Sequence, residues 1–286
     1  MDKELLSGFR EMFTPSILIV VIPTAILGFV LSGGAYWKLL IAIPLIVLAD
    51  GGANAINNYS DWEIDRVNRK RLALHANFSR LGVLSVYCIT LIAIFAILVV
   101  TKANAFLWTS VGLFVLLGIF YSLFMKLKDI IVANYVAIAV AYGGLSTAIG
   151  FFSGSGSFGL FVSKTFFVII FLVLMFFGYS ITKDYADVKG DKMHGKKTLP
   201  VVIGKDASVT FQIVLISIAY AFVIVLVLLG VLGIPFAVLL IPYAFAMYSL
   251  SRIYKTDNKE SHKWSLRQMQ YNSIAVSILI ILLAAI

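Results

Sequence analysis

The stretch KLLIAIPLIVLADGGANAINNYSDWEID (Lys38–Asp65) joins the two features that decide the fold. Its first part, 38–60, is apolar over more than the roughly 18 residues that a helix needs to cross a membrane. Its last part carries Asn57, Asp61 and Asp65 at intervals of four residues. Such steps advance a helix by about 40° beyond a full turn, so we expect these side chains on one narrow stripe. An apolar span thus carries a set of oxygen ligands to the membrane surface.

Asp50 and Asn54 extend this stripe toward the interior of the bilayer. A carboxylate inside a membrane costs at least about 2.5 kcal/mol and normally faces the bundle interior or a wet cavity. We therefore expect both residues either to satisfy polar partners inside the bundle or to line a cavity.

A second acidic set, Asp184, Asp187 and Asp191, lies where a later apolar run ends. If this segment is helical, the three carboxylates stay within an arc of about 60°, although Gly190 is a candidate helix break. The first acidic set follows the second predicted span of the chain, and the second set follows the sixth. Because both of these spans are even-numbered, we expect the two sets at the same face of the membrane, facing each other across one cavity.

Composition sets the class of protein. The chain is 61% hydrophobic and 13% charged, with a mean hydropathy of +0.99, which excludes a water-soluble domain. We predict an all-α integral membrane protein with nine transmembrane helices in a bundle around a central cavity. We further expect a single domain, 1–286, made of two motif-bearing halves, 1–129 and 130–286. The nine predicted spans are 15–34, 38–60, 81–101, 104–124, 130–151, 165–183, 208–231, 234–251 and 268–286.

The basic residues orient this bundle. Of the 23 Lys and Arg residues, 20 fall in the N-terminal segment and the loops after even-numbered spans, and only Lys38, Lys102 and Lys164 fall on the other side. The positive-inside rule then predicts a cytoplasmic N-terminus, with both acidic sets at the cytoplasmic mouth of the bundle. The net charge of +9 follows from this topology, so the expected partner is the lipid bilayer and not a nucleic acid.

Clustered carboxylates repel one another unless a cation lies between them. Hard oxygen ligands suit Mg²⁺, which bridges carboxylates to substrate phosphates, and two ions on a diphosphate would neutralise a leaving pyrophosphate. The competing interpretation is that these acids only pair with nearby Lys and Arg at the membrane interface. Two regularly spaced sets in one chain favour the metal site.

Two stretches resemble the signatures of the UbiA superfamily of intramembrane prenyltransferases: NNYSDWEID (Asn57–Asp65) and KDYADVKGD (Lys183–Asp191). The continuation of the second stretch through Gly195, Lys197, Thr198, Leu199 and Pro200 is also similar to the family's. The resemblance extends over nearly the whole chain and leaves an archaeal source open. It implies Mg²⁺-dependent transfer of a prenyl group from a polyprenyl diphosphate to an aromatic or other lipophilic acceptor.

The resemblance also implies roles for single residues. Asn57, Asp61 and Asp65 would hold one Mg²⁺ and the diphosphate, while Asp187 and Asp191 would hold a second ion. Asp184 would be a ligand or an acceptor-side base. The diphosphate would also meet Tyr121, one of Lys126 and Lys128, and Arg69.

In one place the chain departs from the family pattern. Many members have an Arg-Pro-type segment after the first motif, whereas 68–77 here reads NRKRLALHAN. This argues against the subfamilies that make precursors of archaeal ether lipids, chlorophyll or haem. Quinone precursors, a glycerol-phosphate lipid and haem nevertheless all stay open as acceptors. The alternative classes are an ion-coupled transporter, which would place its acids near mid-membrane, and a CDP-alcohol-type transferase, whose Asp-Gly-rich run is absent.

Overall fold

The computed structural model describes residues 3–67, 70–193, 195–256 and 258–284, and within these ranges it contains helices and no strand. The first half comprises α1 (Lys3–Phe13), α2 (Pro15–Ser32), η1 (Tyr36–Lys38), α3 (Leu39–Ser60), α4 (Trp62–Val67), α5 (Leu72–Asn77), α6 (Arg80–Val100), α7 (Ala105–Ile119), η2 (Phe120–Phe124) and η3 (Leu127–Asp129). The second half comprises α8 (Ile131–Ala139), η4 (Val140–Leu145), α9 (Ser146–Gly154), α10 (Phe158–Ile181), η5 (Thr182–Asp184), α11 (Val188–Met193), α12 (Leu199–Ile203), α13 (Lys205–Leu228), η6 (Ile234–Leu239), α14 (Leu240–Lys255) and α15 (Lys259–Ala284).

In the described part of the chain, eight helices are long and apolar enough to span a membrane. The bent pair formed by α1 and α2, with an angle of 58° between its arms, brings the number to nine if it counts as one span. The all-helical membrane fold is therefore as predicted. The structure extends the sixth span to Phe158–Asp184 and the ninth to Lys259–Ala284. The ninth helix begins with polar turns, KESHKWSLR, that hydropathy alone does not include.

Two of the spans contain a turn of π-helix. The segment Phe120–Phe124 continues α7, and Val140–Leu145 joins α8 to α9 without a break. A π-turn widens the helix locally, and such turns occur often at functional sites. These two carry Tyr121 and Tyr142, which both line the central cavity.

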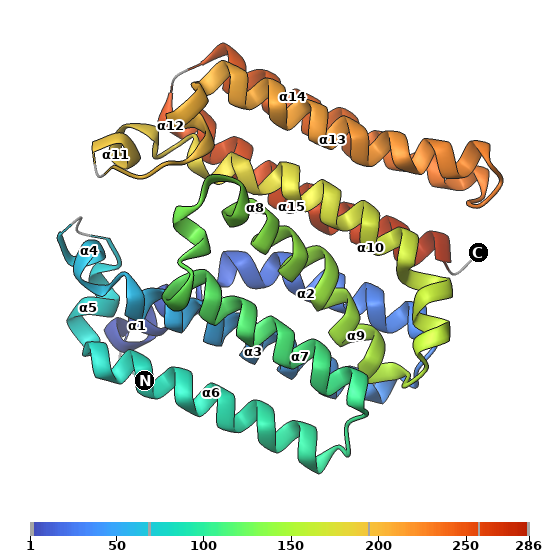
Figure 1. Cartoon of the computed structure of the whole chain (residues 1–286), viewed down its shortest axis with the longest axis horizontal. Helices are drawn as coiled ribbons and strands as arrows, with labels where there is room; N and C mark the ends of the chain where they lie inside the picture. Colours follow the sequence, from blue (N-terminus) through green and yellow to red (C-terminus); the bar gives the residue numbers. More distant parts are fainter. Residues whose placement is uncertain (1–2, 68–69, 194, 257, 285–286) are drawn as a thin grey trace.

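Figure 1 shows the short helices α4, α5, α11 and α12 gathered at one end of the bundle. The turn between α9 and α10 and the end of α15 lie at the opposite end. Helix α1 packs against α5 and α3, which closes the first end from below. The loops that follow the two acidic motifs are thus neighbours in space although they are far apart in sequence.

Glycines allow the closest helix contact in the bundle, between α2 and α9. A Cβ atom on Gly28 would overlap the carbonyl oxygen of Thr147, and one on Gly150 would overlap that of Ala25. In lipid, helix association depends on close packing of this kind, because burying apolar surface gives little advantage. The packing of α2 against α9 therefore depends on small side chains.

We expect the substitution Gly28→Val to lower the thermal stability of the protein, because the new side chain must push α2 away from α9. Overpacking of a core costs about 1–3 kcal/mol, which is several degrees in Tm for a chain of this size. Gly112→Val is the matched control, since nothing lies within 4 Å of a Cβ atom at Gly112. Thermal unfolding in detergent compares the two, and equal Tm values would contradict the packing described here.

Candidate active site

The first acidic motif is divided between two helices. Helix α3 ends at Ser60, and Asp61 follows as its C-cap, with its N–H donated to the Asn57 carbonyl at 3.0 Å. Asp65 lies one turn later on α4, where its carboxylate pairs with Arg71. The Asp65 N–H is donated to the Asp61 carbonyl at 2.8 Å, so the four-residue steps continue helically through Asp65, although Asp65 does not line the polar pocket described below.

The second motif follows the end of α10. Asp184 is in η5, Asp187 lies in the turn after it, and Asp191 is on α11. The chain folds back helically here, with the Asp191 N–H donated to the Asp187 carbonyl at 2.8 Å. Gly190 does not break this segment but lies within α11.

The two motifs meet in a polar pocket of about 230 Å³. Its acidic and amide groups come from both halves of the chain, and its basic groups surround them. The lining comprises Asn57, Ser60, Asp61, Ile64, Lys70, Tyr121, Ser122, Lys126, Lys128, Asp129, Asn134, Lys183, Asp184, Asp187, Asp191, Lys196, Lys197 and Thr198. Five of the six members of the two acidic sets thus line one pocket, and Asp65 does not.

Lys128 makes the densest set of contacts in the polar pocket. Its Nζ donates to Asp61 Oδ1 at 2.6 Å, to Ser60 Oγ at 2.5 Å and to Asn57 Oδ1 at 3.2 Å. Lys126, on the other hand, adopts a left-handed backbone conformation with φ 45° and is exposed at the pocket rim. Of the two lysines that the sequence could not separate, Lys128 is the one bound to the first motif.

The second motif has its own basic partners. Lys259 lies 3.7 Å from Asp187, and Lys196 lies 4.0 Å from Asp191. Burial raises the pKa of the Asp191 carboxyl above its ordinary value, and Asp187 adds to this, while Lys196 opposes it. The acids thus do pair with nearby lysines, as the competing interpretation of simple interface charges requires. These ion pairs, however, lie around a pocket and do not cover it.

Asp184 is held by a partner that the sequence did not reveal. Tyr135 donates its hydroxyl to Asp184 Oδ2 at 2.6 Å, and the same hydroxyl accepts the Leu199 N–H at 3.0 Å. Asp184 is 8% exposed, so the Tyr135 hydrogen bond fixes a buried carboxylate at the base of the pocket.

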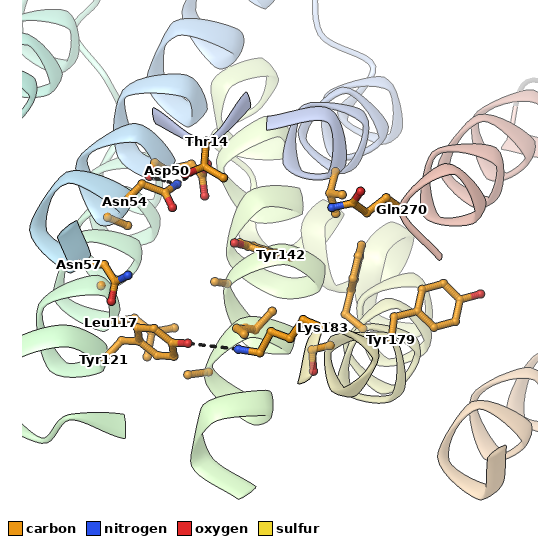
Figure 2. A pocket seen from close by; sticks show the side chains of 18 of the residues that line it. Thr14, Asp50, Asn54, Asn57, Leu117, Tyr121, Tyr142, Tyr179, Lys183 and Gln270 are labelled. Carbon is orange, nitrogen blue, oxygen red and sulfur yellow. Dashed lines mark hydrogen bonds between the residues drawn. The ribbon is translucent and has the colours of Figure 1, made fainter. Parts of the chain in front are cut away.

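Two further pocket residues are Lys183, for which the sequence left open a phosphate contact or a purely topological role, and Asn134, which the sequence did not single out. Lys183 Nζ donates to Asn134 Oδ1 at 2.9 Å, and Tyr121 OH donates to the same oxygen at 2.8 Å. The π-turn aims Tyr121 at this point from the opposite wall, as Figure 2 shows. No sequence signal joins these residues, because they come from three separate helices. Arg69, predicted to contact the diphosphate, lies outside the described residues.

A larger and mainly apolar cavity, of about 380 Å³, continues from the polar pocket into the bundle. The two spaces share Asn57, Tyr121 and Lys183. The apolar walls include Phe114, Leu117, Ile138, Ala141 and Phe176. A ligand with a charged head and a hydrocarbon tail fits this pair of spaces.

The donor set suits a hard cation but is not arranged as a finished metal site. Among the described residues, no group of three or more Asp, Glu, His or Cys side chains is close enough to hold a metal ion. The oxygens of Asn57, Asp61, Asp187 and Asp191 nevertheless line one pocket, and Mg²⁺ normally completes its shell with water and substrate phosphate oxygens. The residues therefore fit Mg²⁺ held jointly with a phosphorylated ligand.

The fold and the pocket together define a polytopic membrane protein with an intramembrane site for an amphipathic phosphorylated ligand. Residues 20–274 match the model of the UbiA prenyltransferase family, so the chain belongs to that family.

Similar proteins match most of the chain in sequence, and solved structures match it in fold. A protein named digeranylgeranylglyceryl phosphate synthase from Methanothrix thermoacetophila is 30% identical over 89% of this chain and 92% of its own. One of the same name from Methanothermobacter thermautotrophicus is 28% identical over 70% of this chain and 68% of its own. A UbiA homologue from Archaeoglobus fulgidus, solved with GPP and Mg²⁺, superimposes with a TM-score of 0.75 at 15% identity, covering 98% of this chain and 100% of that one.

The names of these relatives bear on one sequence-based interpretation. The missing Arg-Pro segment was expected to argue against enzymes of archaeal ether lipids, yet these matches are to proteins named digeranylgeranylglyceryl phosphate synthase. In the structure Arg71 follows the first motif and pairs with Asp65 without any proline. The absence of that segment therefore does not separate this chain from such proteins.

We expect Lys128→Ala to weaken Mg²⁺-dependent binding of pyrophosphate at least about tenfold, since a charge-assisted contact to phosphate contributes about 1.5–3 kcal/mol. Lys126→Ala is the matched control and should weaken binding less than threefold. Calorimetric titration in detergent measures both, and a larger effect of Lys126→Ala would contradict the contacts described here.

Proposed function

We propose that the protein transfers a prenyl group from a polyprenyl diphosphate to the hydroxyl of a lipophilic glycerol-phosphate acceptor, with release of pyrophosphate. The observation that carries this proposal is the junction at Asn57, Tyr121 and Lys183, three residues that line both the polar pocket and the apolar cavity. A diphosphate on one side of this junction puts its first prenyl carbon at the entrance to the apolar side.

The names of similar proteins support the choice of ligands. Relatives are named digeranylgeranylglyceryl phosphate synthase, and homologues of the same fold were solved with GPP or DMAPP together with Mg²⁺. A glycerol-phosphate lipid alcohol is therefore our first choice of acceptor, and an aromatic quinone precursor is the second.

Mg²⁺, bound with the substrate, would supply positive charge against the diphosphate as the carbon–oxygen bond breaks. Asn57, Asp61 and Asp65 would hold one ion, and Asp187 and Asp191 a second. For Asp65 to bind the ion, its ion pair with Arg71 must break. Asp61 must bind the ion beside Lys128, with which it forms an ion pair. The structure described here is thus the form in which lysine and arginine balance the acids.

The residues of the chain perform the remaining work. Lys128 and Lys183 stand at the diphosphate side of the junction, where they orient the leaving group and stabilise its growing charge. The bond between the prenyl carbon and the bridging oxygen breaks, and its electron pair leaves with pyrophosphate. Phe114, Phe176 and Tyr142 surround the prenyl chain and keep water from the cationic carbon until the acceptor attacks.

We also propose that the mouth of the polar pocket opens to the cytoplasm. Basic residues concentrate at the end of the bundle that carries both motifs, as the positive-inside rule requires of a cytoplasmic face. Both substrates would then enter from the inner leaflet or the cytoplasm.

Asp61→Ala and Asp187→Ala should each lower pyrophosphate release at least about 100-fold, the loss typical when one preorganised charge-stabilising group is removed. Asp206→Ala is the matched control, because this exposed aspartate begins α13 away from both pockets. The measurement is Mg²⁺-dependent pyrophosphate release from geranylgeranyl diphosphate in detergent. Turnover retained in both site variants would contradict the scheme.

Comparing acceptors tests the lipid assignment. With an alkylglycerol phosphate as acceptor, we expect turnover at least about 100-fold faster than with hydroxybenzoate, because a site built for one polar group discriminates strongly against another. Product formation is followed by mass spectrometry. A preference for the aromatic acid would replace the proposed acceptor with the aromatic class.

A further inference from the structure

One carboxylate in the apolar cavity takes no part in the two motifs. Asp50 is 1% exposed and lines the cavity from α3, in the middle of a membrane-spanning helix. Burying a charged or polar group this deeply is unfavourable unless a partner compensates it. An unexplained carboxylate at such a position calls for a function.

The protein itself gives Asp50 little compensation. Asn54 Nδ2 donates to Asp50 Oδ2 at 3.1 Å and to the Asp50 carbonyl at 2.9 Å. In the described part of the chain, no other side chain hydrogen-bonds this carboxylate, and no ion pair includes it. Its second oxygen is thus left without a protein donor beside a cavity.

The position of Asp50 relative to the first motif is set by the helix. Figure 2 shows Asp50, Asn54 and Asn57 on the same side of α3, which leads down toward Tyr121 and Lys183. Seven residues separate Asp50 from Asn57, which is two helical turns or about 10 Å. In the reaction, the nucleophilic oxygen lies about 3 Å from the reacting carbon. Its hydrogen bond to a carboxylate adds about 2.7 Å. Both distances together fit within the separation of Asp50 and Asn57.

We infer that Asp50 is the acceptor-side catalytic residue: it binds the attacking hydroxyl of the acceptor and takes its proton. This rests on the proposed prenyl transfer. A carboxylate accepts hydrogen bonds and repels anions, so its partner must be a donor such as an alcohol. Asn54 holds the carboxylate in place, as a positioning residue.

The prenyl carbon loses its bond to the bridging oxygen, whose electron pair departs with pyrophosphate. A lone pair of the acceptor oxygen forms the new carbon–oxygen bond, and the O–H proton moves to an Asp50 carboxylate oxygen. Asp50 later gives the proton to water, so the net products are an ether, pyrophosphate and one proton.

The same carboxylate selects among acceptors. An acceptor that turned a carboxylate or phosphate toward Asp50 would place two anions together in a low-dielectric cavity. The anionic group of the acceptor must therefore point elsewhere, and Arg71 is a basic residue that lines the same cavity and is not assigned to the diphosphate. Asp50 thus favours an alcohol over an aromatic acid at this end.

The test uses the full-length protein in detergent, with geranylgeranyl diphosphate, Mg²⁺ and an alkylglycerol phosphate. Asp50→Asn keeps the shape and should lower kcat for transfer at least about 100-fold, the range for loss of a general base. Its affinity for an unreactive geranylgeranyl thiolodiphosphate should stay within twofold of the wild type. Asp206→Asn, which also removes one carboxylate, should match the wild type in both measurements.

Three results would count against the inference. Transfer by Asp50→Asn within threefold of the wild type would overturn the role of Asp50 alone. Parallel loss of kcat and of thiolodiphosphate affinity would show that Asp50 only supports the fold, which also overturns it. If the wild type itself transfers to no alcohol but does so to an aromatic acid, the proposed acceptor fails, and the role of Asp50 fails with it.

Discussion

The arrangement of this protein depends on placing several carboxylates at one end of a membrane bundle without mutual repulsion. Lys128 meets the first motif with three hydrogen bonds, and Arg71, Lys196 and Lys259 each pair with a further acid. The positive charge of each partner offsets the repulsion between neighbouring carboxylates. A cation such as Mg²⁺ can replace these lysines and this arginine at the acids. The pocket therefore suits a ligand that brings both phosphate and Mg²⁺.

The second constraint is that the polar pocket lies next to the apolar cavity. The polar pocket and the apolar cavity share Asn57, Tyr121 and Lys183, so a substrate that bridges them has its charged and hydrocarbon parts on opposite sides of these residues. The two π-turns carry Tyr121 and Tyr142, which both line the apolar cavity. In the proposed reaction, the carbon–oxygen bond thus breaks at one position along the cavity, and the acceptor binds at another.

Hydropathy and the spacing of the acids predicted most of the fold and the meeting of the two motifs. These features are local, since a span or a four-residue step can be recognised without knowing its neighbours. The partners of the acids could not be predicted in the same way: Tyr135 reaches Asp184 across 49 positions, and Lys183 reaches Asn134 across the same number. The ion pair of Asp65 with Arg71 is likewise a contact that the spacing of the acids does not reveal. Asp50 was noticed in the sequence only as an intramembrane acid, and its place in the cavity required the packed helices.

The central claim is that both acidic motifs hold one diphosphate between α3 and α11. A crystal structure with Mn²⁺ in place of Mg²⁺ and an unreactive prenyl thiolodiphosphate tests this most directly, because manganese can be located by its anomalous scattering. The account predicts manganese in the polar pocket, with ligands from Asp61 on one side and from Asp187 or Asp191 on the other, and the diphosphate between them. Manganese bound by a single motif, or a diphosphate outside this pocket, would contradict it.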